Sequence, residues 1–217
     1  MTQHENNAKL GGLLTTRNMT RISLLSMMGA VLTIFNWSNV PGFPPFLSLD
    51  IGDVPSVVGT LAMGPWAGVL IQLLGNIVKV VVSTSTMGIG ELANFLIGTS
   101  YILPFALAYH LFSKTKVRFI VAAIFGTIGM MIMGAIGNYF IFLPLYAHFM
   151  FNGMEPIISF AATVTPVLGL INENWVITDV WSLIIIGITP FNMLKGFITS
   201  LVAFFVYRAI KPILLRT

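Results

Sequence analysis

Cysteine is absent from this chain of 217 residues, and charged residues make up only 8% of it. The absence of cysteine excludes disulfide bonds, thiolate nucleophiles and cysteine-based metal sites. A soluble domain carries about 25% charged residues, so a chain this poor in charge cannot keep a water-exposed surface in solution. The lipid bilayer is therefore the expected solvent. Helices are the expected spanning elements, because each helix satisfies its own backbone amides.

Motifs for catalysis and nucleotide binding are missing as well. The chain contains no Walker A pattern, which excludes ATP hydrolysis by a P-loop. It contains neither a Gly-x-Ser-x-Gly elbow nor a His-Glu-x-x-His zinc helix. His4, His110 and His148 lack metal-ligand spacing, and the basic residues are spread over several loops rather than gathered into a nucleic-acid-binding patch. The sequence thus predicts a membrane binding protein with no catalytic residues, no metal site, no cofactor and no nucleic-acid partner.

Hydrophobic residues make up 56% of the chain and fall into six segments. A helix needs roughly 20 residues to cross a bilayer, and the second segment is shorter than that. The segments are 22–37, 51–63, 65–83, 92–112, 119–144 and 181–207. We expect an all-α integral membrane protein with six transmembrane helices. Its membrane domain spans 22–210, flanked by cytoplasmic tails at 1–21 and 211–217.

The basic residues predict which face of this protein is cytoplasmic. Nine of the eleven Lys and Arg residues precede the first span, lie between the fourth and fifth, or follow the sixth, while the other loops carry acidic residues. The nine are Lys9, Arg17, Arg21, Lys114, Lys116, Arg118, Arg208, Lys211 and Arg216. With six spans all three groups lie on one face, which the positive-inside rule makes cytoplasmic together with both termini.

The two remaining basic residues, Lys79 and Lys195, lie inside apolar segments, where a charge is costly and marks a functional site. Lys79 is near the outer end of its helix and can also be explained by snorkelling to the interface. Lys195 lies deeper and shares a helix face with Asn192, below a break expected at Pro190. An amide beside an ammonium suits a flat heterocycle edged with carbonyls and ring NH groups, although a polar clamp between helices is the alternative.

Other polar side chains within the spans form a second set of candidates. Asn138 has aromatic neighbours and is the better ligand candidate, whereas Asn76 and Asn94 can equally be contacts between helices. Asp50, Asp53 and Glu91 lie near expected helix starts, where capping and the helix dipole explain acidic residues.

The first span and the loop after it carry two further features. Ser26 and Ala30 form a small-residue pair that allows another helix to approach closely. The loop 40–46 is stiff and aromatic, and can fold over a ligand or serve as a plain connector.

Four stretches of the chain resemble the substrate-binding S components of energy-coupling-factor (ECF) vitamin importers, and within them the riboflavin-specific branch. They are FLSLDIGDVP at 46–55, GPWAGVLIQLLGNIVK at 64–79, GELANFL at 90–96 and TPFNMLKG at 189–196. The resemblance implies six helices in a bacterial cell membrane, an outward-facing vitamin pocket and a first loop that acts as its lid.

The resemblance also implies which residues bind and which partners assemble. It assigns the isoalloxazine edge to Asn138, Asn192 and Lys195, with further contacts from the region 50–55, Asn76 and the stretch from Glu91 to Asn94. Lys79 joins these candidates through its charge inside a span. Ser26 and Ala30 take the place of the family's Ala-x-x-x-Ala motif, which docks on a transmembrane coupling protein; two ATPase subunits complete the complex and use the ATP.

Three alternatives remain open at this stage. The chain can be an S component for another vitamin or a modified nucleobase, which would keep the topology and change the pocket. It can be a small intramembrane enzyme such as a lipid-modifying transferase, although no convincing nucleophile is present. It can also be a structural or channel-like subunit, although its polar residues gather in the outer half rather than at every depth.

Overall fold

The structure is a computed structural model that describes residues 15–113, 117–170, 172 and 174–214. Most of the expected N-terminal tail, the end of the C-terminal tail, and the basic residues Lys9, Lys114, Lys116 and Arg216 lie outside these ranges. Among the described residues the first helix begins at Thr16, six residues before the expected membrane domain, and the last ends at Leu214.

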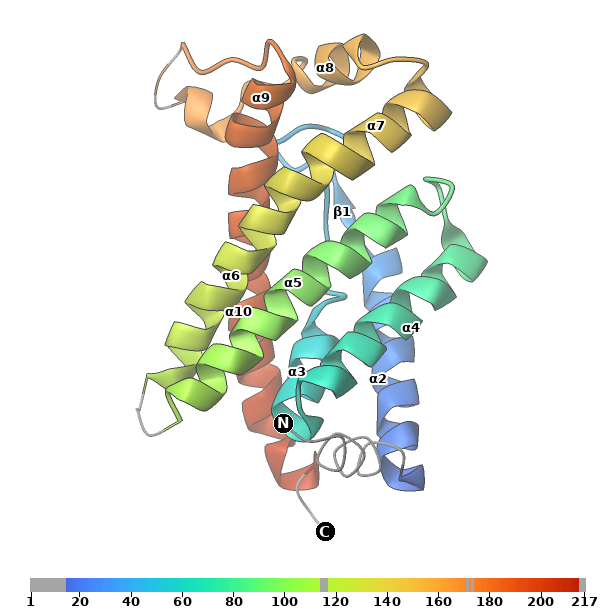
Figure 1. Ribbon diagram of the computed structural model, residues 1–217, viewed down its shortest axis with the longest axis vertical. Coiled ribbons are helices and arrows are strands. Elements are labelled where there is room, and N and C mark those ends of the chain that lie inside the picture. The colour runs from blue at the N-terminus through green and yellow to red at the C-terminus, as the bar shows by residue number, and fades with distance from the viewer. Residues whose placement is uncertain (1–14, 114–116, 171, 173, 215–217) are drawn as a thin grey trace.

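The described chain has six main helical stretches, arranged as Figure 1 shows. The first four are α2 (Thr16–Ile34), α3 (Val54–Met63), α4 (Pro65–Ser83) and α5 (Ile89–Leu111). The fifth joins α6 (Arg118–Gly137), η1 (Asn138–Phe142), α7 (Leu143–Tyr146) and η2 (Ala147–Phe151), and the sixth joins α9 (Val180–Ser182), η4 (Leu183–Ile188) and α10 (Thr189–Leu214). Between the last two lie α8 (Glu155–Ala161) and η3 (Val167–Leu170), in a connection for which no elements were predicted.

The hydrophobic character of these helices confirms the membrane fold. Within the described residues, four helices are long and apolar enough to cross a bilayer, at Pro65–Ser83, Ile89–Leu111, Arg118–Phe151 and Val180–Ile210. Helix α3 is shorter, as predicted. Large apolar side chains such as Leu107, Ile120 and Phe197 are at least 60% exposed, which is stable only against lipid tails.

Two prolines within the last two spans follow π-helical turns instead of breaking the helix. Pro144 comes two residues after η1, and Pro190 two residues after η4. Proline lacks an N–H and its ring collides with the carbonyl four residues earlier. A widened turn with i→i+5 hydrogen bonds relieves that collision and lets the helix continue. The break expected at Pro190 therefore takes the form of a wide turn in a continuous helix.

The interior has two larger apolar cores, one in each half of the molecule, and a smaller cluster between α2 and α4. In the inner half, α3, α5, α6 and α10 pack around the buried rings of Tyr101 and Phe105, and the Tyr101 hydroxyl lies 2.7 Å from the Ser200 hydroxyl. In the outer half, α8 covers a second core that includes Leu143 and Ile188. The polar residues of the candidate site lie between these two cores.

The small-residue face of α2 packs against α4 inside the chain, and its docking on a partner stays a prediction. Ser26 and Ala30 are 3% and 1% exposed. A Cβ atom added at Gly75 of α4 would lie 3.2 Å from the Ser26 carbonyl oxygen and 3.6 Å from the Ala30 nitrogen. The pair therefore allows α4 to approach α2 closely, as small residues do between membrane helices.

A short hairpin follows α2, in a region where no strand was predicted. Strands β1 (Trp37–Ser38) and β2 (Ser48–Leu49) pair antiparallel. The loop between them packs on α10 and η3: the Phe43 ring meets Phe191 edge to face at 5.4 Å, and Val167 donates its N–H to the Gly42 carbonyl at 2.9 Å. The stiff aromatic loop is thus anchored at its middle.

The molecule has two distinct ends (Figure 1). The start of α2 and the end of α10 lie together at the bottom of the view, as an even number of spans requires. The strand β1 and helices α7, α8 and α9 lie in the opposite half. Under the positive-inside rule the bottom is cytoplasmic, so the hairpin and α8 face outward.

Candidate substrate-binding site

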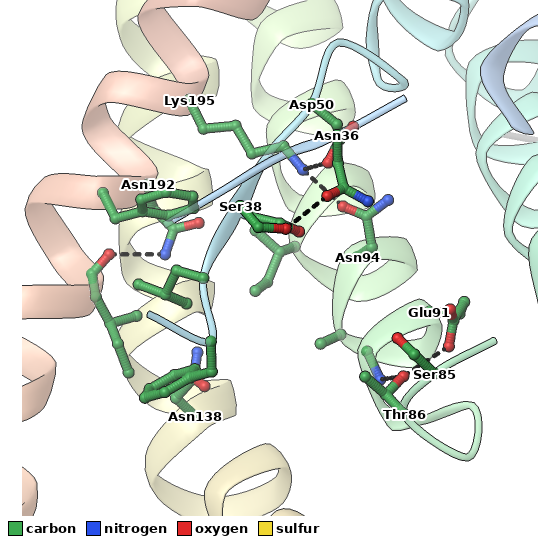
Figure 2. Close-up of a pocket in the computed structure, with 18 of the residues that line it drawn as sticks. Asn36, Ser38, Asp50, Ser85, Thr86, Glu91, Asn94, Asn138, Asn192 and Lys195 are labelled. Atoms are coloured by element: carbon green, nitrogen blue, oxygen red, sulfur yellow. Dashed lines mark hydrogen bonds and ion pairs between the residues drawn. The ribbon is translucent and has the colours of Figure 1, made fainter. Parts of the chain in front are cut away.

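A cavity of about 250 Å³ lies in the outer half of the molecule. Its walls come from the end of α2, the hairpin, the α4–α5 connection, the start of α5, η1 and the start of α10. Figure 2 shows that side chains from these separate elements converge on it. The polar residues lining it are Asn36, Ser38, Ser48, Asp50, Lys79, Ser85, Thr86, Glu91, Asn94, Asn138, Tyr146, Asn192 and Lys195. The cavity is large enough for a small organic molecule with several polar groups.

Lys195 occupies the centre of a buried polar network. Its Nζ lies 3.1 Å from Asp50 Oδ2 and 3.2 Å from Asp53 Oδ2, and it donates to Asn94 Oδ1 at 2.7 Å. Lys195 and both aspartates are at most 6% exposed. Of the three N–H donors of the ammonium group, two donate to Asp50 Oδ2 and Asn94 Oδ1, and Asp53 Oδ2 adds a second buried negative charge beside it. The lysine therefore faces inward, as predicted, and ties α10 to the segment before α3 and to α5.

The two aspartates serve this network rather than the helix end, so the capping explanation is wrong for Asp53. Asp53 occupies the N-cap position of α3 but makes no capping hydrogen bond. Its Oδ1 accepts from Gln72 Nε2 at 2.6 Å, and Gln72 Oε1 accepts from Ser56 Oγ at 2.6 Å. Asp50 accepts the Gly52 N–H at 2.8 Å, which holds the chain in a tight turn. This pairing could not be predicted from local sequence, because it depends on the lysine that α10 supplies.

Asn138 and Asn192 form the amide end of the cavity. Each bonds its Nδ2–H to the carbonyl four residues earlier, Gly134 at 2.7 Å and Ile188 at 2.9 Å. The Oδ1 atom of each is thereby left as the acceptor available to a ligand. A Cβ at Gly134 would overlap the Asn192 amide, so glycine at this position lets α10 bring Asn192 against α6.

Asn94 lines the cavity and Asn76 lies behind it. Asn94 Nδ2 donates to Asn76 Oδ1 at 3.2 Å, and Asn76 Nδ2 donates to the Gln72 carbonyl at 2.8 Å. Asn76 is absent from the cavity wall. Its position supports Asn94 and does not by itself provide a ligand contact.

Lys79 and Glu91 pair across α4 and α5 at the other end of the cavity. Lys79 Nζ lies 3.5 Å from Glu91 Oε1, with the two side chains 17% and 2% exposed. Glu91 Oε2 accepts from the hydroxyls of Thr84 and Thr86 at 3.1 and 3.0 Å. Glu91 lies in the first turn of α5, but its carboxylate holds the preceding loop instead of capping the helix. Lys79 has a partner inside the protein, so snorkelling does not explain it.

The cover of the cavity contains residues that were not predicted from the sequence. Asn36 and Ser38 bond each other, with Ser38 Oγ donating to Asn36 Oδ1 at 2.9 Å, and Phe46 and Ser48 also line the wall. The aromatic loop 40–46 was a usable signal for a cover. Asn36 and Ser38 carried none, since an exposed Asn or Ser after a helix is ordinary turn chemistry.

The chemistry of this site is that of binding. It offers amide oxygens, one buried lysine, several hydroxyls and aromatic rings. No cluster of three His, Asp or Glu side chains that could hold a metal ion occurs among the described residues. Polar groups placed on several helices around one cavity are typical of a specific small-molecule site.

Comparison with known proteins shows which family this chain belongs to. The sequence profile of the family described as "ECF transporter, substrate-specific component" matches residues 17–207, nearly the whole chain. The chain belongs to this family. The S component described here is thus an integral membrane protein and a substrate-binding subunit of a transport system.

Individual members of the family resemble this S component over most of its length. It is 31% identical to the riboflavin transporter FmnP of Bacillus subtilis over 198 residues, covering 90% of this chain and 93% of the relative. It is 34% identical to the riboflavin transporter RibU of Staphylococcus aureus over 200 residues, covering 92% and 93%. A solved S component of a bacterial ECF transporter superposes with a TM-score of 0.66 at 32% identity, covering 91% of this S component and 97% of that chain.

Proposed function

We propose that this S component binds riboflavin from the outer side of a bacterial cell membrane and delivers it to an ATP-driven coupling module. The strongest support is that two relatives, at 31% and 34% identity over about nine-tenths of the chain, are riboflavin transporters. The cavity has the size and the polar groups for a single small ligand.

The amide end of the cavity suits the isoalloxazine ring. The pyrimidine-like edge of that ring alternates carbonyl oxygens with ring nitrogens, one of which carries a proton. The Oδ1 atoms of Asn138 and Asn192 supply acceptors for that N–H. Lys195 can donate to a ring carbonyl by exchanging its contact with Asn94, because this exchange leaves both ion pairs intact. Phe46 and Phe191 line the same cavity and supply apolar surface.

The proposed role includes no ATP hydrolysis by this chain. A transmembrane coupling protein and two ATPase subunits would drive release of the vitamin on the cytoplasmic side. The S component then contributes recognition alone, and its described side chains contain a binding network rather than a nucleophile with an adjacent base.

The experiment is purification in detergent after expression in riboflavin-containing medium, followed by an absorption spectrum and a fluorescence-quenching titration. We expect a yellow protein that quenches added riboflavin. Asn138→Ala and Asn192→Ala should each weaken quenching without loss of folding, because both amides bond only their own helix. The matched control is Asn174→Ala, at an exposed loop position.

A monodisperse protein that is colourless and does not quench riboflavin would overturn the ligand assignment. Competition with other vitamins and with modified nucleobases would then identify the ligand, since these share the architecture with different pocket residues.

A further inference from the structure

The cavity has two chemically different ends. Figure 2 shows Ser85, Thr86 and Glu91 grouped on one side, away from Asn138 and Asn192 on the other. If riboflavin is the ligand, as proposed above, its flat ring lies at the amide end. Its ribityl chain of hydroxyls then extends toward the hydroxyl-lined end, because hydroxyls and carboxylates are the natural partners of a polyol.

The charges around the cavity leave no free cation at either end. Among the described residues that line it, the cations are Lys79 and Lys195. Lys195 is paired with Asp50 and Asp53, and Lys79 is paired with Glu91. The network holds one more carboxylate than ammonium group, so the cavity is acidic on balance.

Glu91 occupies the place where an anion of the ligand would otherwise bind. Its carboxylate contacts an ammonium group at 3.5 Å and two threonine hydroxyls at 3.1 and 3.0 Å. It also lies in the first turn of the 23-residue helix α5, where the helix dipole favours negative charge. The nearby amides have partners too: Gly88 donates to Thr84 Oγ1 at 3.1 Å, and Gly90 to Thr86 Oγ1 at 3.0 Å. A phosphate arriving here would find its donors taken and a carboxylate in its way.

We infer that Glu91 is a specificity-determining residue, which makes this end of the cavity accept a neutral polyol chain and reject the corresponding phosphate monoester. A phosphate monoester carries about −1.5 to −2 charges at pH 7. Placing it beside a buried carboxylate is unfavourable, because charges in a site of low dielectric are poorly screened. The terminal hydroxyl of a neutral chain can instead donate to Glu91. The S component therefore selects riboflavin over riboflavin 5′-phosphate.

The test compares the dissociation constants of these two flavins, measured by fluorescence quenching with purified protein in detergent. Glu91→Gln keeps an oxygen that accepts from Thr84 and Thr86 and frees Lys79 for the phosphate. The preference for riboflavin should then fall roughly tenfold or more, as expected for a charge-assisted contact. Lys79→Gln should act in the opposite direction and widen the preference, because it leaves Glu91 without its counter-charge. The matched control, Glu155→Gln, removes the same charge from an exposed position outside the cavity and should leave the preference unchanged.

A neutral 5′-acetyl ester of riboflavin separates charge from size, and the wild-type protein should bind it better than the phosphate. The inference is overturned if neither variant changes the preference, or if the acetyl ester is rejected as strongly as the phosphate. If Glu91→Gln fails to fold, the flavin preference of Lys79→Gln and the affinity of the wild-type protein for the acetyl ester still test the inference. A wild-type protein that binds no flavin would contradict the proposed function instead, so the two failures are distinguishable.

Discussion

At the scale of single residues, the site depends on buried charges that are balanced by partners from distant parts of the sequence. Lys195 meets Asp50 145 positions earlier in the chain and Asn94 101 positions earlier. A charged group in a low-dielectric interior is tolerated only when it is paired and hydrogen-bonded. The same residues that form the ligand site therefore also hold α10 against α3 and α5.

Replacing Lys195 should destabilise the protein as well as abolish binding. Lys195→Met leaves two carboxylates buried without a counter-charge, and removing one member of a buried ion pair costs about 3–5 kcal/mol. The melting temperature in detergent should fall clearly, as followed by size-exclusion chromatography after heating. Asp53→Asn should cost much less, because it leaves one ammonium with one carboxylate and keeps the acceptor for Gln72.

The double variant Lys195→Met/Asp53→Asn provides the control. It should be more stable than Lys195→Met alone, because one uncompensated charge is removed. Equal stability of these two variants would mean that the lysine does not act through the aspartates.

A second residue-scale prediction concerns Gly134, whose missing side chain makes room for the Asn192 amide. Gly134→Ala forces the amide out of position, and overpacking of this kind costs about 1–3 kcal/mol. The dissociation constant for riboflavin should rise roughly tenfold, consistent with that cost. Ile136→Ala, on the exposed side of the same helix, should leave it unchanged. A Gly134→Ala variant with normal affinity would show that Asn192 has freedom to move.

At the scale of elements, the outer half contains secondary-structure elements that are too short to be stable in isolation. The hairpin has strands of two residues, and an isolated hairpin is marginal in water. It is held by the contacts of its loop with α10 and η3, in particular by the edge-to-face pair of Phe43 and Phe191. We expect the hairpin to control how easily a ligand enters and leaves.

Removing the Phe43 ring should therefore speed ligand release. Phe43→Ala deletes an aromatic pair that contributes about 0.5–1.5 kcal/mol beyond its buried area, so riboflavin should dissociate roughly twofold to tenfold faster. Stopped-flow recovery of flavin fluorescence after mixing with competitor measures this rate. Phe35→Ala, at a neighbouring ring that is 78% exposed, is the matched control. Identical dissociation rates for the two variants would exclude the loop as the cover.

At the scale of the whole molecule, the distribution of charge sets the orientation in the membrane. The absence of cysteine allows a direct test with single introduced thiols. Thr163→Cys lies in the connection after α8, and Ser113→Cys lies just after α5; both positions are exposed. A membrane-impermeant maleimide should label Thr163→Cys on intact cells and Ser113→Cys only after the membrane is opened. The reverse labelling pattern would mean that the topology is opposite to the one described here.

Several features of this protein could be read directly from the residues. The low charge content and the apolar segments determined a helical membrane protein, because a bilayer permits few other structures. The deep position of Lys195 marked a functional contact, since such a charge must have a partner. Proline at position 190 marked an irregular turn, but local sequence does not distinguish a break from a π-helical turn that the helix passes through.

Other features were decided only by tertiary structure, because they depend on which helices become neighbours. The small residues Ser26 and Ala30 look alike whether they face a partner protein or α4, and only the packing assigned them to α4. Asp53 has the sequence context of a helix cap, yet its carboxylate forms an ion pair with Lys195 instead. The sequence alone therefore determined the kind of protein and most of the polar residues of its site. The fold determined which of those residues contact each other, because ion pairs within a membrane form between segments far apart in the chain.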